Sequence, residues 1–152
     1  MHIACYYFPG YHPEPKMERH FGQGWTEWEL MKRAEARFPG HRMPIVPQWG
    51  MENEAEPAAM ARKIEAAAGH GIDSFIFDWY WYEDGPFLNR PLDEGFLPQI
   101  ERFPAFQFSL MWANHDWADI FPAKHHDRQK VLFAGAVTWQ EWEHLTDFVV
   151  QT

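Results

Sequence analysis

Residues 72–79 read Ile-Asp-Ser-Phe-Ile-Phe-Asp-Trp, an apolar run that only small or acidic side chains interrupt. A strand that is covered on both faces has this character, whereas a strand with one wet face alternates apolar and polar residues. Residues 56–70, which lead into the run, form the clearest helical pattern in the chain. Pro57 suits a first turn, and Met60 and Ile64 fall on one face. The sequence therefore predicts a helix followed directly by a buried strand.

Similar patterns extend on both sides of this pair. Apolar runs at residues 2–8 and 106–112 predict two further strands. Thr-x-x-Glu capping boxes begin at Thr26 and Thr138 and predict two further helices, the first from about residue 27 to 37. A short helical segment is also expected near residues 92–97, whereas the proline-rich stretch after the first strand predicts a loop.

The resulting order alternates strands and helices three times, which is typical of a parallel α/β sheet. A doubly wound sheet and a (β/α) barrel both fit this order. The loop that follows the first strand, Pro9-Gly10-Tyr11-His12-Pro13, lacks the glycine spacing of a phosphate-binding loop. This disfavours a nucleotide site at that position.

The composition restricts the partners of the chain. With 22 acidic and 13 basic residues the formal net charge is -9, which disfavours nucleic acid. No apolar run is long enough to span a membrane, and no signal peptide is visible, so we expect a cytoplasmic protein without a membrane partner. Cys5 is the single cysteine and is expected to be a small buried hydrophobe.

Each of the three predicted strands ends in aromatic and polar residues. The clusters are Tyr6-Tyr7 with Tyr11-His12, Asp78-Trp79-Tyr80-Trp81-Tyr82, and Trp112-Ala113-Asn114-His115-Asp116-Trp117. The ends of parallel strands meet at one side of a barrel. Aromatic rings stack on sugar rings, while carboxylate, amide and imidazole groups bind hydroxyls. The clusters therefore favour a carbohydrate site, although rings that fill space between sheet and helices would give a similar pattern.

Several short motifs occur together in a characteristic order. They are Tyr6-Tyr7-Phe8-Pro9-Gly10-Tyr11-His12-Pro13, Gly24-Trp25-Thr26-Glu27-Trp28, Phe38-Pro39-Gly40-His41, Gly71-Ile72-Asp73, Phe77-Asp78-Trp79-Tyr80-Trp81, Pro91-Leu92-Asp93 and Trp112-Ala113-Asn114. Together they resemble the N-terminal part of the glycoside hydrolase family 99-like, WbsX-type proteins. One departure is His115, where many relatives have a glutamate.

The resemblance implies a (β/α)8 TIM-barrel fold of which this chain, taken as a single domain of residues 1–152, holds the first three βα units. A complete barrel takes about 250 residues. The chain is therefore expected either to lack a C-terminal half or to associate with itself. The implied function is glycan processing, most simply hydrolysis of a glycosidic bond. The alternatives are a glycosyltransferase of cell-surface polysaccharide biosynthesis and a noncatalytic sugar-binding fragment.

Candidate site residues follow from these clusters. Asp116 and His115 are the candidate proton-handling pair, because histidine titrates near neutral pH. The candidate sugar-binding residues are Tyr7, His12, Trp25, Glu27, Trp28, Asp78, Trp79, Tyr80, Trp81, Trp112, Asn114 and Trp117. No cofactor is implied, and no metal site is predicted at His125-His126-Asp127, since adjacent histidines diverge. The acidic run at residues 52–56 is expected to be a solvated loop.

Overall fold

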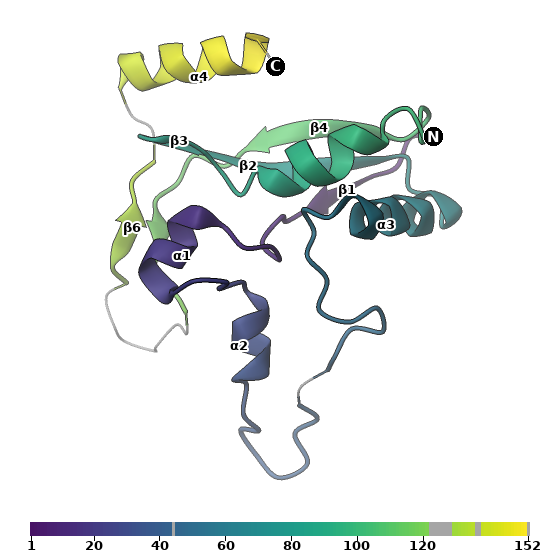
Figure 1. The fold of residues 1–152 in the computed structure, drawn as a ribbon, viewed down its shortest axis with the longest axis vertical. Helices are drawn as coiled ribbons and strands as arrows, with labels where there is room; N and C mark the ends of the chain where they lie inside the picture. The colour runs from purple at the N-terminus through teal and green to yellow at the C-terminus, as the bar shows by residue number, and fades with distance from the viewer. Residues whose placement is uncertain (44, 122–128, 136–137, 152) are drawn as a thin grey trace.

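A computed structural model describes residues 1–43, 45–121, 129–135 and 138–151. The part described is a mixed α/β fold built on a parallel sheet (Figure 1). This confirms the prediction of a parallel α/β arrangement.

The sheet has β2 (Ser74–Tyr82) at its centre, with β1 (Ala4–Tyr7) and β4 (Gln107–Trp112) parallel to it on either side. A short strand, β3 (Gly85–Phe87), turns back antiparallel onto the last residues of β2. All three parallel strands were expected, but β2 continues past Trp79 because it forms this hairpin.

The register of the sheet assigns each strand residue to a face. Tyr7 is paired with Phe77, and Asp78 with Met111. Paired residues in neighbouring parallel strands share a face, and successive residues alternate. Tyr7 and Phe77 therefore lie on one face of the sheet, while Asp78 lies on the other.

Three helical elements cover the face that carries Phe77. They are α3 (Pro57–Gly69), the π-helical segment η1 (Pro91–Phe96) and α4 (Trp139–Gln151). Their apolar residues form one core cluster with side chains of β2, and Met60 of α3 is completely buried in it. A 3-10 turn, η2 (Leu97–Gln99), follows η1.

Among the described residues, those that cover the opposite face pack towards the carboxyl end of the strands. There, rings of β2 and β3 pack with α1 (Pro15–Phe21) and with the two-stranded pair β5 (Trp117–Ala118) and β6 (Val131–Phe133) in a second core cluster. Nearer the amino ends of the strands, the part of the chain that the structure describes leaves Tyr6 70% exposed on this face.

The prediction of a loop over residues 11–15 was wrong at its last residue, because α1 begins at Pro15. Pro15 occupies the first turn, where a missing amide hydrogen costs nothing, and the carboxylate of Glu14 accepts a hydrogen bond from the amide of Lys16 at 3.1 Å. Neither β5 nor β6 was expected, because both are too short to show a pattern.

The two capping boxes differ. At the second, Thr138 and Glu141 bond reciprocally, with Glu141 accepting from the Thr138 amide at 2.7 Å and donating its own amide to the Thr138 hydroxyl at 3.2 Å. The first box does not form, because the carboxylate of Glu29 pairs with Lys32 instead. The helix there, α2 (Trp28–Lys32), is much shorter than the predicted span to residue 37.

A long irregular connection separates α2 from α3. Figure 1 shows it as the loop at the foot of the view, projecting away from the sheet. It returns through Glu52 and Glu54 to α3, and this return passage contributes to the site described next.

Candidate functional site

Tyr80 lies at the centre of a cluster on the face of the sheet that the three helical elements do not cover. Its ring contacts those of Trp117 and His115 edge-to-face, with centroids 5.3 and 5.7 Å away. Burial, followed by the negative charges of Asp78 and Glu27, raises the pKa of the Tyr80 phenol. The carboxyl groups of Asp78 and Glu27 therefore both lie within electrostatic reach of one phenol.

Glu27 comes to this cluster from the first connection of the fold. It occupies the position before α2, and its carboxyl carbon lies 3.1 Å from where a Cβ on Gly10 would stand. Glycine at position 10 thus leaves room for the acid. Burial and then repulsion by Glu54 raise the pKa of Glu27 to about 7, so that this carboxyl group changes charge near neutral pH.

Two buried polar atoms of the cluster have no hydrogen-bond partner among the described residues. They are Oδ1 of Asp78, an acceptor, and Nε1 of Trp117, a donor. Burial raises the pKa of Asp78, and the nearby His115 partly offsets this effect. A hydroxyl group both donates and accepts hydrogen bonds, so it matches this pair of atoms chemically.

Glu54 is a buried carboxylate with several partners, and the sequence did not identify it as a site residue. It is only 3% exposed and accepts hydrogen bonds from the Tyr7 hydroxyl at 2.8 Å and from the Tyr11 amide at 3.0 Å, while pairing with Lys63 of α3. The expectation of a solvated acidic run at residues 52–56 was wrong here, because three partners offset the cost of burying this carboxylate.

Four predicted sugar-binding residues lie on the helix-covered face instead. Tyr7 packs on Phe75 and Phe77 with centroids 5.0 and 4.9 Å away. Trp79 and Trp81 pack on Phe148 of α4, at 6.1 and 5.1 Å. These three side chains are thereby separated from Asp78 by the thickness of the sheet.

The fourth is Trp112, whose ring meets that of Trp142 edge-to-face at 4.5 Å. It shares the helix-covered face because it is paired with Trp79 in the register. The structure thus places Trp112 among packing contacts between the sheet and α4.

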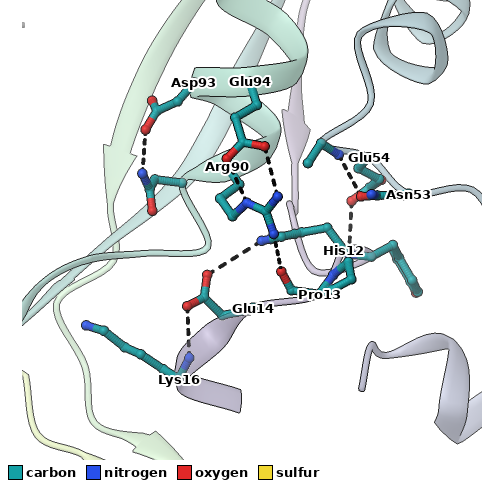
Figure 2. Close-up of polar contacts among 12 residues, drawn as sticks. His12, Pro13, Glu14, Lys16, Asn53, Glu54, Arg90, Asp93 and Glu94 are labelled. Atoms are coloured by element: carbon teal, nitrogen blue, oxygen red, sulfur yellow. Dashed lines mark hydrogen bonds and ion pairs between the residues drawn. The ribbon is translucent and has the colours of Figure 1, made fainter. Parts of the chain in front are cut away.

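His12 and Trp25 are both buried. His12 is 1% exposed, and its Nε2 lies 3.6 Å from the carboxylate of Glu14 (Figure 2). Arg90 fixes the same segment by donating to the carbonyl oxygen of Pro13 at 2.7 Å. Trp25 packs against Phe21 in the second core cluster.

Trp28 lies beside Glu27 in the sequence but contacts other residues. Its ring lies 4.1 Å from that of Tyr11, and its Nε1 donates to the carbonyl oxygen of Glu52 at 2.8 Å. It therefore lines the space next to the connection rather than the Tyr80 cluster.

The third predicted cluster divides between the site and its rim. His115 and Asp116 are exposed, as is Asn114. His115 faces Tyr80, but Oδ1 of Asp116 accepts a hydrogen bond from the amide of Gly135 at 2.9 Å. That bond ties two loops together, which is a structural task that the sequence did not reveal.

Among the described residues, no group of three or more acidic, histidine or cysteine side chains could hold a metal ion. The segment that carries His125, His126 and Asp127 lies outside the described residues. None of the helices in the described ranges has the length and apolar character that a bilayer crossing requires.

Comparison with known proteins places the chain in a family. Residues 3–152 match the family model described as Glycosyltransferase WbsX. The chain belongs to the WbsX family. This confirms the resemblance drawn from the motifs, and it relates the chain to glycan metabolism.

Relatives of this WbsX-family chain include proteins described as uncharacterized protein WxcX from two strains of Xanthomonas campestris pv. campestris, B100 and ATCC 33913. Each is 29% identical over 126 residues, which cover 82% of this chain and 18% of the relative. The matched part of the chain thus spans less than a fifth of the length of these relatives. No solved structure matches it significantly.

Proposed function

We propose that this chain supplies part of the glycan site of a carbohydrate-active enzyme, with Glu27 as its proton donor. The observation that carries the proposal is a half-buried carboxyl group with a pKa of about 7, within electrostatic reach of the Tyr80 phenol that Asp78 also influences. A general acid works best when its pKa lies near the working pH. The membership of the WbsX family supports a glycan as the substrate.

Asp78 and Trp117 would bind a sugar hydroxyl through the acceptor and donor atoms that have no other partner among the described residues. His115, which faces Tyr80, would handle the second proton. From the sequence-predicted pair, His115 stays in the proposed mechanism, while Asp116 takes the loop-bridging position at Gly135.

In hydrolysis, Glu27 would protonate the leaving glycosidic oxygen as its bond to the anomeric carbon breaks. Water would then bond to that carbon and lose a proton to His115 as the base. We infer in addition that the three parallel strands belong to a (β/α) barrel. Its active side would be the carboxyl end of the strands, where Asp78 lies.

Transfer of a sugar from an activated donor is the second candidate, because the family carries the name of a glycosyltransferase. The two reactions differ in the acceptor, which is water in one case and a sugar hydroxyl in the other. Turnover in oxygen-18-labelled water separates them, since only hydrolysis places the label on the new reducing end.

The test uses the complete gene product and the polysaccharide of the cells that make it. Glu27→Gln should lower kcat by roughly 100-fold or more, because the variant cannot donate a proton. Glu29→Gln, two residues away and ion-paired with Lys32, is the matched control and should retain activity. Full activity of the Glu27→Gln protein would remove Glu27 from the mechanism.

A further inference from the structure

A hollow lies between α2 and the connection that leads to α3. It encloses about 280 Å³, and the indoles of Trp28 and Trp49 contribute to its lining together with Gln48, Glu52 and Lys63. Pockets for drug-sized ligands begin at about 300 Å³. This hollow therefore suits something no larger than one sugar ring.

Both indoles are held in place before any ligand arrives. Trp28 is fixed by its hydrogen bond to the Glu52 carbonyl and by the Tyr11 ring. Trp49 is 45% exposed, and the guanidinium of Arg62 lies over its ring, 5.3 Å from the centroid. Arg62 is in turn ion-paired with Glu52, so a single network positions both rings.

The charges of the lining are already paired. Lys63 is ion-paired with Glu54, and Glu52 with Arg62. A carboxylated or phosphorylated ligand would need a cation that these contacts leave uncommitted. Neutral hydroxyl groups, by contrast, can exchange hydrogen bonds with the Gln48 amide and with the atoms of the ion-paired side chains that still face the hollow.

From these contacts we infer that the hollow between Trp28 and Trp49 is a binding subsite for one neutral hexose or deoxyhexose ring. The apolar face of the sugar would pack on the exposed Trp49 indole, and its hydroxyls would meet Gln48. The inference rests on the proposed glycan function in its choice of ligand. It adds a site outside the Tyr80 cluster.

Fluorine NMR of the complete gene product, labelled with 5-fluorotryptophan, tests this directly. Trp49→Phe identifies the Trp49 resonance by its loss. The probes are the methyl glycosides of glucose, galactose, mannose and rhamnose. At least one of them should shift the Trp49 resonance saturably. Trp49→Ala, followed through the resonance of Trp28 in the same lining, should weaken that binding roughly tenfold.

Gln48→Ala, which leaves both rings in place, should weaken the same binding by a smaller factor. Trp139→Ala removes an indole that is 85% exposed on α4 and should leave the affinity unchanged. No saturable shift at Trp49 with any of the four glycosides would overturn the inference. Equally tight binding of methyl glucuronide would overturn its restriction to neutral sugars.

The titration is repeated in Glu27→Gln protein, which separates the two proposals. Sugar binding at Trp49 with unchanged affinity in this variant supports the subsite, whatever the variant does to turnover. Loss of turnover without any binding at Trp49 would leave Glu27 in its role and refute the subsite alone.

Discussion

Glu27 should make the protein less stable as the pH rises. Its folded-state pKa is about 7, above its ordinary value of 4.5. Between these two pH values Glu27 is protonated in the folded state and ionised in the unfolded state. The free energy of unfolding therefore falls as the pH rises through this range. Glu27→Gln should therefore stabilise the fold by the order of 2 kcal/mol at pH 8 and hardly at all at pH 4.

Urea denaturation at the two pH values measures this difference. Glu29→Gln is the control, because the hydrogen bond from Lys32 outweighs the effect of burial and lowers the pKa of Glu29. A gain at pH 8 that appears in both variants would show that net charge, and not the burial of Glu27, is the cause.

Tyr7 provides a second prediction at the scale of single residues. Tyr7→Phe removes a hydroxyl that donates a hydrogen bond to Glu54 at 2.8 Å and accepts one from Lys63 at 2.9 Å. The variant should lose about 1–2 kcal/mol of unfolding free energy in denaturant titrations. Its glycan affinity should stay unchanged, since Tyr7 lies on the helix-covered face. A loss of affinity without a loss of stability would return Tyr7 to the sugar site.

At the scale of elements, the contact of η1 with the start of α3 depends on Gly95. A Cβ there would stand 2.6 Å from the carbonyl oxygen of Glu54 and 3.3 Å from Met60. Backbone cannot yield as a side-chain tip can, so Gly95→Ala should cost about 1–3 kcal/mol in thermal or chemical unfolding.

Gly69→Ala is the matched control within α3, because nothing lies within 4 Å of the added Cβ. Alanine favours a helix over glycine, so this variant should be neutral or more stable by up to about 0.5 kcal/mol. Equal losses in the two variants would contradict the proposed packing of η1.

The elements that the sequence predicted well have strong local signals. The apolar run of β2 and the breakers around α3 locate both elements to within a few residues. The short α1 was missed, since two prolines mark a loop as readily as a helix start. The predicted length of α2 assumed that Glu29 completes a capping box with Thr26. Glu29 pairs with Lys32 instead, and the local sequence pattern does not distinguish these two partners.

The candidate site was predictable in composition but not in geometry. Asp78, Trp79, Tyr80 and Trp81 alternate across β2, so only two of them can share a face. Which pair faces the site depends on where α4 packs, and this is a tertiary contact. Glu54 was misjudged for the same reason, because its partners Tyr7 and Lys63 come from distant elements.

For the whole molecule, the edges of the parallel sheet lead to a prediction. In the described residues β1 and β4 each pair with β2 alone. Phe108 and Leu110 of β4 are 38% and 39% exposed. Unpaired, apolar strand edges promote association. Residues 1–152 expressed alone should therefore self-associate.

Light scattering after size-exclusion chromatography measures the molar mass and so distinguishes the monomer from the associated chain. Phe108→Lys should shift the isolated chain towards monomer, because a charged edge opposes pairing. A purely monomeric chain that binds no hydrophobic dye would show that these edges need no partner.

The adjacency of Glu27 and Trp28 has a consequence for the products. The two residues are neighbours in the chain at the start of α2. Glu27 lies against Gly10 and within electrostatic reach of Tyr80, whereas Trp28 lines the hollow beside Trp49. The backbone between adjacent residues cannot stretch. The distance from a sugar ring bound at Trp49 to the glycosidic bond that Glu27 would protonate would therefore be fixed. Such an enzyme would act as a molecular ruler and release fragments of uniform length rather than a random mixture.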